Sequence, residues 1–225
     1  MPPTAKRTRK AGRNKAATLR CHSQRRLFAA LISIGKNARK VVFETMKRDE
    51  QRASGIAARN ALSWEERERR SLAIVEQIVA SPLWRDADIV LSYRAVGHEV
   101  DLSALEDYAR AEGKRLCYPL CTAPGEMIAL LPRDAQSWRK GSYGICEPIR
   151  ELSEEIPPEA LKLVLCPCTA YDSENHRMGM GGGYYDRYLP RCTNAHFVAV
   201  AFTVQECDRL DVQPWDVGME AVVRS

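Results

Sequence analysis

The spacing of hydrophobic and polar residues predicts two helices before the first strand of the chain. Residues 47–61 are expected to form the first helix. Ser63 is followed three residues later by Glu66, the capping-box signature of a helix N-terminus. The second helix is predicted to reach about residue 80 and to end at Ser81-Pro82, with a buried stripe made of Leu72, Val75, Ile78 and Val79.

Short apolar runs predict strands that are buried in a sheet, at residues 88–93, 115–120, 127–131, 161–166 and 197–202. Between the first two runs, Asp101 is predicted to cap a helix that continues to Glu112 and stops at Gly113. Strands that alternate with helices favour a mostly parallel sheet covered on both faces. The pattern therefore predicts an α/β fold, and residues 47–225 are expected to form a single domain.

The charge of the chain is unevenly distributed. The 225 residues carry a net charge of +5, but residues 1–43 hold twelve Lys or Arg and no acidic residue. The remainder has 22 basic against 29 acidic residues, a net charge of −7. An acidic body argues against nucleic acid as a partner of the folded part.

Residues 1–46 are expected to be a disordered basic extension outside the domain. Their composition is typical of a mitochondrial transit peptide, and it also fits a basic arm or a stretch upstream of the natural start. Met46 is followed at once by Lys47-Arg48, and we favour it as that start. The location is then cytoplasmic, or mitochondrial if the extension is a transit peptide.

The eight cysteines form no Cys-x-x-Cys pair, which argues against a zinc knuckle. Reduced thiols in a cytosol-like compartment are expected. No apolar run reaches the roughly 18 residues that a membrane span requires. We therefore expect no membrane partner.

The strongest chemical signal is the glycine segment, which we define as residues 177–189. Four glycines fall within residues 179–183, and a short helix is predicted to follow and to end at Pro190. Glycine-rich backbone can turn its N–H groups around an anion, and a helix N-terminus favours phosphate. Arg177 and Arg187 flank the glycines as forked cations, and Asp186 is a candidate ligand for a hard cation such as Mg²⁺.

Two common phosphate-binding loops do not match this segment. A P-loop needs Gly-Lys-Ser/Thr after its spacer, and none follows. The dinucleotide fingerprint needs a third glycine where Tyr184 stands. A glycine turn that serves tight packing remains the structural alternative.

The glycine segment resembles the signature of the 5-formyltetrahydrofolate cyclo-ligase family, Arg-Leu-Gly-x-Gly-x-Gly-Tyr-Tyr-Asp. Met178 replaces the leucine, residues 163–166 are the preceding strand and Tyr171-Asp172 is the hydrophobic-Asp pair. The resemblance extends over most of residues 47–223. It implies a three-layer α/β/α fold with a mostly parallel sheet, related to the sugar-phosphate isomerase and CoA-transferase type.

The resemblance also implies an activity in one-carbon metabolism. A ligase of this family converts 5-formyltetrahydrofolate to 5,10-methenyltetrahydrofolate with ATP and Mg²⁺, and releases ADP and phosphate. The formyl oxygen is phosphorylated to an iminophosphate before the ring closes. The implied partners are ATP and the folate, with or without a polyglutamate tail. A monomer that binds no nucleic acid is expected.

Carried over by resemblance, the catalytic residues are Arg177, Tyr184 and Asp186, and the Mg²⁺ ligands are Asp186 and Asp172. Arg48 and Arg52 lie four apart on the first helix, so both point the same way; Arg48 stands in the position of the family's Lys. A solvated helix face is the alternative for these two residues. The complete set implied for ATP is Lys47, Arg48, Arg52, Arg177, Gly179, Met180, Gly181, Gly182, Gly183, Tyr184 and Tyr185.

The folate contacts implied by the resemblance are Glu99, Met127, Tyr143, Gly144, Ile145, Pro148 and Tyr185. Glu99 follows the strand at residues 88–93, and ligands of α/β proteins bind beyond the carboxyl ends of parallel strands. A polar loop residue for Glu99 and a core methionine for Met127 are the alternatives. Besides Arg48 and Met178, two further positions depart from the family, since Cys168 and Asn175 stand where it has glycine. Asn tolerates the left-handed region, so the turn at Asn175 can survive.

Two other functions remain open. A relative with the same nucleotide loop could act on another substrate, such as thiamine or a different pterin. A nucleic-acid-binding protein could use the basic arm instead. No Ser-His-Asp or Cys-His arrangement is evident, and His98, His176 and His196 are isolated, which favours structural roles for them.

Overall fold

The computed structural model describes residues 47–141 and 145–225. The predictions made for residues 1–46 and for Tyr143 and Gly144 lie outside the described residues. Within the described residues, no helix is long and apolar enough to span a membrane.

A seven-stranded sheet forms the centre of the domain, in the order β11-β10-β7-β1-β2-β3-β6. The first five strands are parallel, and β3 and β6 are antiparallel to their neighbours. A mostly parallel sheet is thus confirmed. The strands are β1 (Ile89–Leu91), β2 (Arg115–Ala123), β3 (Glu126–Pro132), β6 (Ser153–Ile156), β7 (Leu163–Pro167), β10 (His196–Ala201) and β11 (Ala221–Arg224).

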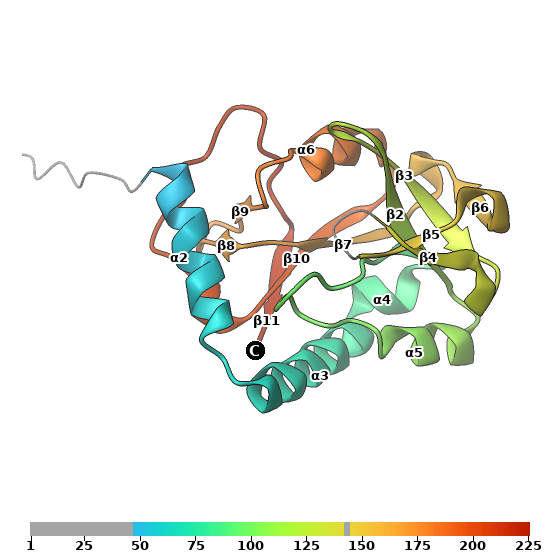
Figure 1. The fold of residues 1–225 in the computed structure, drawn as a ribbon, viewed down its shortest axis with the longest axis horizontal. Coiled ribbons are helices and arrows are strands. Elements are labelled where there is room, and N and C mark those ends of the chain that lie inside the picture. The colour runs from blue at the N-terminus through green and yellow to red at the C-terminus, as the bar shows by residue number, and fades with distance from the viewer. Residues whose placement is uncertain (1–46, 142–144) are drawn as a thin grey trace, which may run out of the picture. The chain divides into compact units, whose positions relative to one another are not determined.

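Helices cover both faces of this sheet (Figure 1). One face packs against α3 (Trp64–Ala80), α4 (Pro82–Asp86) and α5 (Leu105–Glu112), and the other against α6 (Tyr184–Tyr188) and the 3₁₀ turn at Leu189–Arg191. Alternation along β7 supplies both cores, because Leu163 and Leu165 face the first set while Val164 and Cys166 face the second. The expected three-layer α/β/α arrangement is what the chain adopts.

Helix α3 confirms the Ser63 cap but not the whole predicted stripe. The Ser63 hydroxyl accepts from the Glu66 N–H at 3.1 Å, and the helix ends at Ala80 as predicted. Leu72, however, is 51% exposed, while Ile74 is fully buried. The prediction for Leu72 is wrong because the buried face runs through residues 71, 74, 75 and 78, which places Leu72 outside it.

Helix α5 begins later than predicted. The Asp101 carboxylate accepts from the Ser103 N–H at 2.9 Å and so closes a turn, and the helix starts only at Leu105. Asp101 therefore precedes the helix and does not cap it. The predicted stop is confirmed, since Gly113 is the C-cap with φ 68°.

Several short elements carried no clear pattern in the sequence. Two-stranded ladders join β4 (Trp138–Lys140) to β5 (Cys146–Pro148) and β8 (Ala170–Tyr171) to β9 (Arg177–Met178). Further 3₁₀ turns occupy Ala135–Ser137, Arg150–Leu152, Pro158–Ala160 and Thr203–Gln205. The β8–β9 ladder matters for the site because it delivers the chain into the glycine segment.

The first helix, α2 (Arg48–Asn60), packs on the segment that follows β7. Gly55 makes this close approach possible, because a Cβ there would lie 2.0 Å from the carbonyl oxygen of Thr169. The helix is thereby held beside the glycine segment, and its side chains can reach the space beyond the carboxyl end of β7.

Candidate active site

A cavity of about 650 Å³ opens beyond the carboxyl ends of β1 and β7, and we call it the main cavity. This is where α/β proteins place their ligands. Its walls include most of the residues singled out in the sequence: Arg48, Arg52, Glu99, Met127, Ile145, Arg177, Gly179, Met180, Gly181, Gly182, Gly183, Tyr184, Tyr185 and Asp186. The sequence thus predicted which distant segments converge here.

The glycine segment lines one end of the main cavity with open backbone. Gly181 has φ 101° and Gly183, the N-cap of α6, has φ 65°, both in the region that favours glycine. Within the described residues, the N–H groups of Gly181, Gly182, Gly183 and Tyr184 donate no hydrogen bond. Unpaired backbone donors at a helix start favour an anion.

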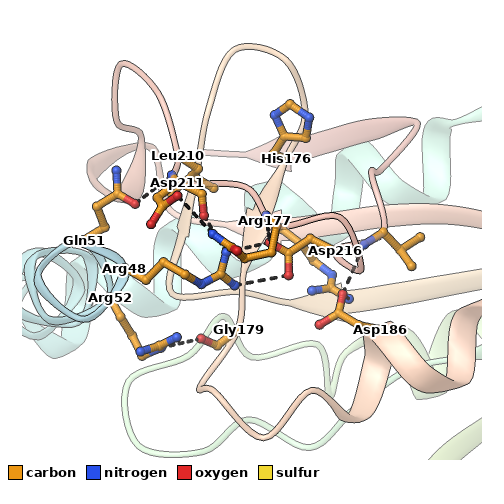
Figure 2. A network of polar contacts seen from close by, with 12 residues as sticks. Arg48, Gln51, Arg52, His176, Arg177, Gly179, Asp186, Leu210, Asp211 and Asp216 are labelled. Carbon is orange, nitrogen blue, oxygen red and sulfur yellow. Dashed lines mark hydrogen bonds and ion pairs between the residues drawn. The ribbon is translucent and has the colours of Figure 1, made fainter. Parts of the chain in front are cut away.

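Arg177 and Asp186 form an ion pair within the same wall (Figure 2). Nη2 of Arg177 donates to Oδ1 of Asp186 at 3.1 Å, and the N–H of Val217 donates to the same oxygen at 3.2 Å. Arg177 is 5% exposed, and its Nε has no partner among the described residues. No described group donates to Oδ2 of Asp186, so one carboxylate oxygen is available to a ligand.

The arginines of α2 are engaged by the protein (Figure 2). Arg48 contacts both carboxylate oxygens of Asp216, at 2.6 and 3.1 Å, and also the Asp211 carbonyl. Arg52 donates from Nε to the carbonyl oxygen of Gly179 at 2.9 Å. Arg48 and Arg52 therefore hold the 211–216 segment and the glycine segment against α2. These contacts argue against the alternative in which the two arginines only form a solvated helix face.

Asp216 is a cavity residue that sequence reasoning missed. It lies in an irregular stretch, and no glycine pattern or strand end marks it. Its carboxylate accepts from Arg48 and from the N–H of Gln213 at 2.8 Å. Next to it, Val217 contacts Asp186, so the 216–217 pair links α2 to the ion pair of the glycine segment.

Arg187 supports the glycine segment by a hydrogen bond to its backbone. Nη1 donates to the Gly182 carbonyl oxygen at 2.8 Å. Its guanidinium packs so closely on the β2–β3 turn that a Cβ at Gly125 would lie 2.5 Å from Nη1. Part of its donor capacity is thereby used to hold the loop, although the residue also lines the main cavity.

Glu99 lines the main cavity, whose walls also include the apolar side chains of Met127, Ile145 and Tyr185. The N–H of Val96 donates to its Oε2 at 3.0 Å. Burial raises the pKa of Glu99, and the Val96 N–H and the Arg59 guanidinium oppose part of that rise. Apolar walls around a few polar anchors suit a flat ring that carries N–H groups.

Some predicted site residues lie elsewhere. The carboxylate of Asp172 accepts from the backbone N–H groups of Glu174, His176 and Leu210, and it lies outside the walls of the main cavity. Its geometry is that of a structural turn and does not support a metal role. Lys47 and Pro148 are also absent from these walls.

The histidines and cysteines have structural surroundings. His98, His176 and His196 contact Asn60, Asp172 and Glu220. The seven described cysteines are all free, and Cys168 is buried with its thiol near the Val200 carbonyl. Asn175 has φ 62°, which confirms that it holds the left-handed turn expected at this position. The described residues contain no group of three or more His, Cys, Asp or Glu placed to hold a metal.

Comparisons with known proteins agree with the signature of the glycine segment. The model of the 5-formyltetrahydrofolate cyclo-ligase family matches residues 44–225. The 5-formyltetrahydrofolate cyclo-ligase of Mus musculus is 28% identical over 183 residues, covering 72% of this chain and 86% of that protein. The enzyme of that name from Escherichia coli K12 is 26% identical over 169 residues, covering 73% and 93%.

The fold is similar as well. The NMR structure of Aquifex aeolicus 5,10-methenyltetrahydrofolate synthetase matches with a TM-score of 0.71 and 31% identity, covering 80% of this chain and 90% of that one. A family match over residues 44–225, together with this shared fold, establishes the relationship. The chain belongs to the 5-formyltetrahydrofolate cyclo-ligase family.

Proposed function

We propose that this chain catalyses the ATP- and Mg²⁺-dependent conversion of 5-formyltetrahydrofolate to 5,10-methenyltetrahydrofolate, with release of ADP and phosphate. Family membership supports the reaction class. The single observation that carries the nucleotide part is that residues 181–184 line the main cavity while, among the described residues, their N–H groups donate no hydrogen bond. Such donors suit the terminal phosphates of a nucleotide.

The residues present fit a magnesium ion bound together with the nucleotide. Mg²⁺ is usually held by one or two carboxylates and by substrate phosphates, so a cluster of three protein ligands is not required. Asp186 lines the main cavity and keeps Oδ2 free of hydrogen bonds from described residues. When bound, Mg²⁺ would neutralise part of the negative charge of the nucleotide phosphates. Asp186 would hold the ion beside them.

In the proposed reaction the formyl oxygen of the folate attacks the γ-phosphorus of ATP, and ADP leaves. The neighbouring aniline nitrogen then attacks the activated formyl carbon, loses its proton, and phosphate leaves as the ring closes. Such a reaction depends mainly on positioning and on charge stabilisation. Arg177 supplies a buried cation at the start of the glycine segment, which suits the negative charge of the transferred group.

The folate is proposed to lie between the glycine segment and Glu99. Tyr184 and Tyr185 line the main cavity directly after the glycines, and Met127 and Ile145 supply apolar wall. A carboxylate can accept hydrogen bonds from the N–H edge of a pterin, and this is the role proposed for Glu99. Asp172, Lys47 and Pro148 receive no role here, because they lie outside the walls of this cavity.

We further propose a monomer in a reducing compartment such as the cytoplasm. The free state of the seven described cysteines supports such a compartment. Folates with and without a polyglutamate tail are proposed substrates, and nucleic acid is not a proposed partner.

The test is to mix the purified full chain with MgATP and 5-formyltetrahydrofolate and to record the near-ultraviolet spectrum of the methenyl product. Omission of ATP, omission of Mg²⁺ with a chelator present, and replacement of the folate by thiamine form the control arms. The expected result is methenyl absorbance with one equivalent of phosphate, only in the complete mixture. ATP hydrolysis with thiamine but no methenyl product would overturn the folate assignment in favour of another substrate.

A further inference from the structure

Arg59 is a buried arginine that the proposed reaction has not used. It lies in the last turn of α2, is 5% exposed, and is not among the residues that line the main cavity. A buried guanidinium remains charged at any physiological pH and is unfavourable unless it is paired. Its presence next to a ligand-sized cavity therefore requires a partner.

The partner is Glu99. Nη1 of Arg59 lies 3.5 Å from Oε1 of Glu99, and the two side chains are only 6% and 8% exposed. Glu99 is the acidic side chain that pairs with Arg59 among the described residues. Nε and Nη1 of Arg59 make no hydrogen bond within the described residues, so the contact is one of charge more than of aligned hydrogen bonds.

A second contact ties the same two segments together. Nδ1 of His98 lies 2.9 Å from Oδ1 of Asn60, and these residues are the direct neighbours of Glu99 and Arg59. The end of α2 and the loop after β1 are thus joined at two adjacent positions. This arrangement holds Arg59 directly behind the carboxylate that lines the cavity.

The groups that face Glu99 include one cation. They are Arg59 from α2, the Val96 N–H of its own loop, Tyr93 after β1, Cys168 after β7 and Tyr185 of α6. Burial raises the pKa of the Tyr93 and Tyr185 hydroxyls and of the Cys168 thiol, so all three are neutral near pH 7. Among the described residues, Arg59 is therefore the cation that offsets the negative charge of Glu99, in addition to the hydrogen bond from the Val96 N–H.

We propose that Arg59 is a positioning residue that keeps Glu99 ionised and oriented in the wall of the main cavity, ready to accept hydrogen bonds from the N–H edge of a pterin. This inference rests on the proposed function. A pterin offers an amino group and a ring N–H side by side, and an ionised carboxylate accepts from both with its two oxygens. A protonated carboxyl loses part of that acceptor capacity, so the loss of Arg59 weakens recognition most at low pH.

The direction of the pH effect follows from the charges. Burial already raises the pKa of Glu99, and removal of the opposing Arg59 raises it further. Folate binding that needs the ionised form weakens as pH falls through that pKa. In Arg59→Met the decline therefore begins at a higher pH, with a midpoint shifted upward by about one to three units, the effect typical of a nearby opposite charge.

The experiment measures the dissociation constant of 5-formyltetrahydrofolate by calorimetry from pH 5.5 to 9, without ATP, for the full chain and five variants. At pH values below the wild-type midpoint, Arg59→Met is expected to bind about tenfold or more weakly than wild type, because each unit of upward shift costs a factor of ten there, and to recover at high pH. Arg59→Lys, which keeps the charge, restores most of the wild-type profile. Arg70→Met, which removes an arginine paired to Glu66 on α3 outside the main cavity, leaves the profile unchanged.

The double variant Arg59→Met with Glu99→Gln separates this role from a merely structural one. If Arg59 acts through Glu99, the double variant binds folate as Glu99→Gln alone does, with no residual dependence on pH. The double variant also removes both charges of the buried pair. We therefore expect it to fold even if the unpaired carboxylate left by Arg59→Met unfolds the single variant. A Michaelis constant for ATP that stays within twofold of wild type in Arg59→Lys supports the same assignment.

Two failures are distinguishable. Absence of folate binding by the wild-type chain at every pH would overturn the proposed function. If the wild-type chain binds folate and Arg59→Met has the same affinity and the same midpoint in its pH profile, the role of Arg59 is overturned. The proposed function is then left intact. A further loss of affinity in the double variant relative to Glu99→Gln would also contradict an action through Glu99.

Discussion

Arg177 and Asp186 meet across the glycine segment, with Nη2 of the arginine 3.1 Å from Oδ1 of the aspartate. Nine positions separate them in the chain, and the turns at Gly181 and Gly183 bring them together. Oδ1 of Asp186 is thereby committed to the protein, and Oδ2 is left to a ligand.

The first prediction concerns this pair. Asp186→Ala and Arg177→Ala are each expected to lower the turnover rate by about a hundredfold to a thousandfold, because single groups that stabilise developing charge contribute on this scale. Both variants are expected to fold, as judged by circular dichroism. Asp49→Asn is the matched control, since its carboxylate also pairs with an arginine of the site but is 95% exposed. Normal turnover by both alanine variants would refute the assignment.

A second prediction separates Asp172 from Asp186. Burial alone would raise the pKa of Asp172, but the N–H groups of Leu210 and His176 and the His176 side chain lower it overall. Because the folded-state pKa lies below the unfolded value of about 3.9, the ionised carboxylate stabilises the fold fully above that pH. The stabilisation is then lost as pH falls through the folded-state value.

Urea unfolding of wild type and Asp172→Ala between pH 7 and pH 3 measures this contribution. The difference in the free energy of unfolding is expected to be largest at pH 7 and to shrink below about pH 4. Folded Asp172→Ala is expected to keep its affinity for MgATP. A large loss of Mg²⁺-dependent binding without a loss of stability would instead make Asp172 a metal ligand.

A third prediction tests the seating of α2. In Gly55→Ala the new Cβ would meet the Thr169 carbonyl at 2.0 Å, so the helix must shift. We expect a loss of about 1–3 kcal/mol in stability, typical of overpacking, and weaker ATP binding because α2 carries Arg48 and Arg52. Gly218→Ala is the control, since its Cβ would meet no atom within 4 Å. Equal melting temperatures for the two variants would contradict this packing.

A fourth prediction concerns thiol reactivity. Burial raises the pKa of Cys117 and Cys168 to about 12, so neither forms the reactive thiolate near pH 8. Cys121 and Cys146 are exposed and line the main cavity. Iodoacetamide is expected to label these two cysteines before Cys117 and Cys168. 5-Formyltetrahydrofolate with an ATP analogue is expected to protect them, and peptide mass spectrometry measures both effects. Labelling of Cys117 or Cys168 at the same rate would contradict the burial.

Much of the fold was accessible from the sequence because local signals agreed with tertiary packing. The Ser63 cap, the stop at Gly113 and the buried runs in β1, β2, β7 and β10 were predictable since each reflects a strong local preference. The predicted burial of Leu72 was wrong because a helix with apolar residues on more than one side does not reveal which side the sheet covers. The prediction that Asp101 caps a helix was wrong because an aspartate carboxylate closes a turn as readily as it caps a helix.

The convergence of residues on the main cavity was predictable where a motif or a strand end marked them, as at Glu99 and in the glycine segment. Asp216 and Arg59 were missed because their importance comes from partners 168 and 40 positions away along the chain, Arg48 and Glu99. No local pattern encodes such a pairing. The metal role expected for Asp172 rests on a motif that places it near the glycines, whereas in the structure its carboxylate accepts hydrogen bonds from the backbone of a turn.

The proposed nucleotide site depends on the N–H groups of Gly181, Gly182, Gly183 and Tyr184, which donate no hydrogen bond within the part of the chain that the structure describes. Amide hydrogen exchange of the full chain, with and without Mg²⁺ and a non-hydrolysable ATP analogue, measures them directly. We expect these amides to exchange fast in the free protein and at least tenfold more slowly, in peptides covering residues 181–184, when the nucleotide binds. Nucleotide binding with unchanged exchange at these residues would contradict the proposed site.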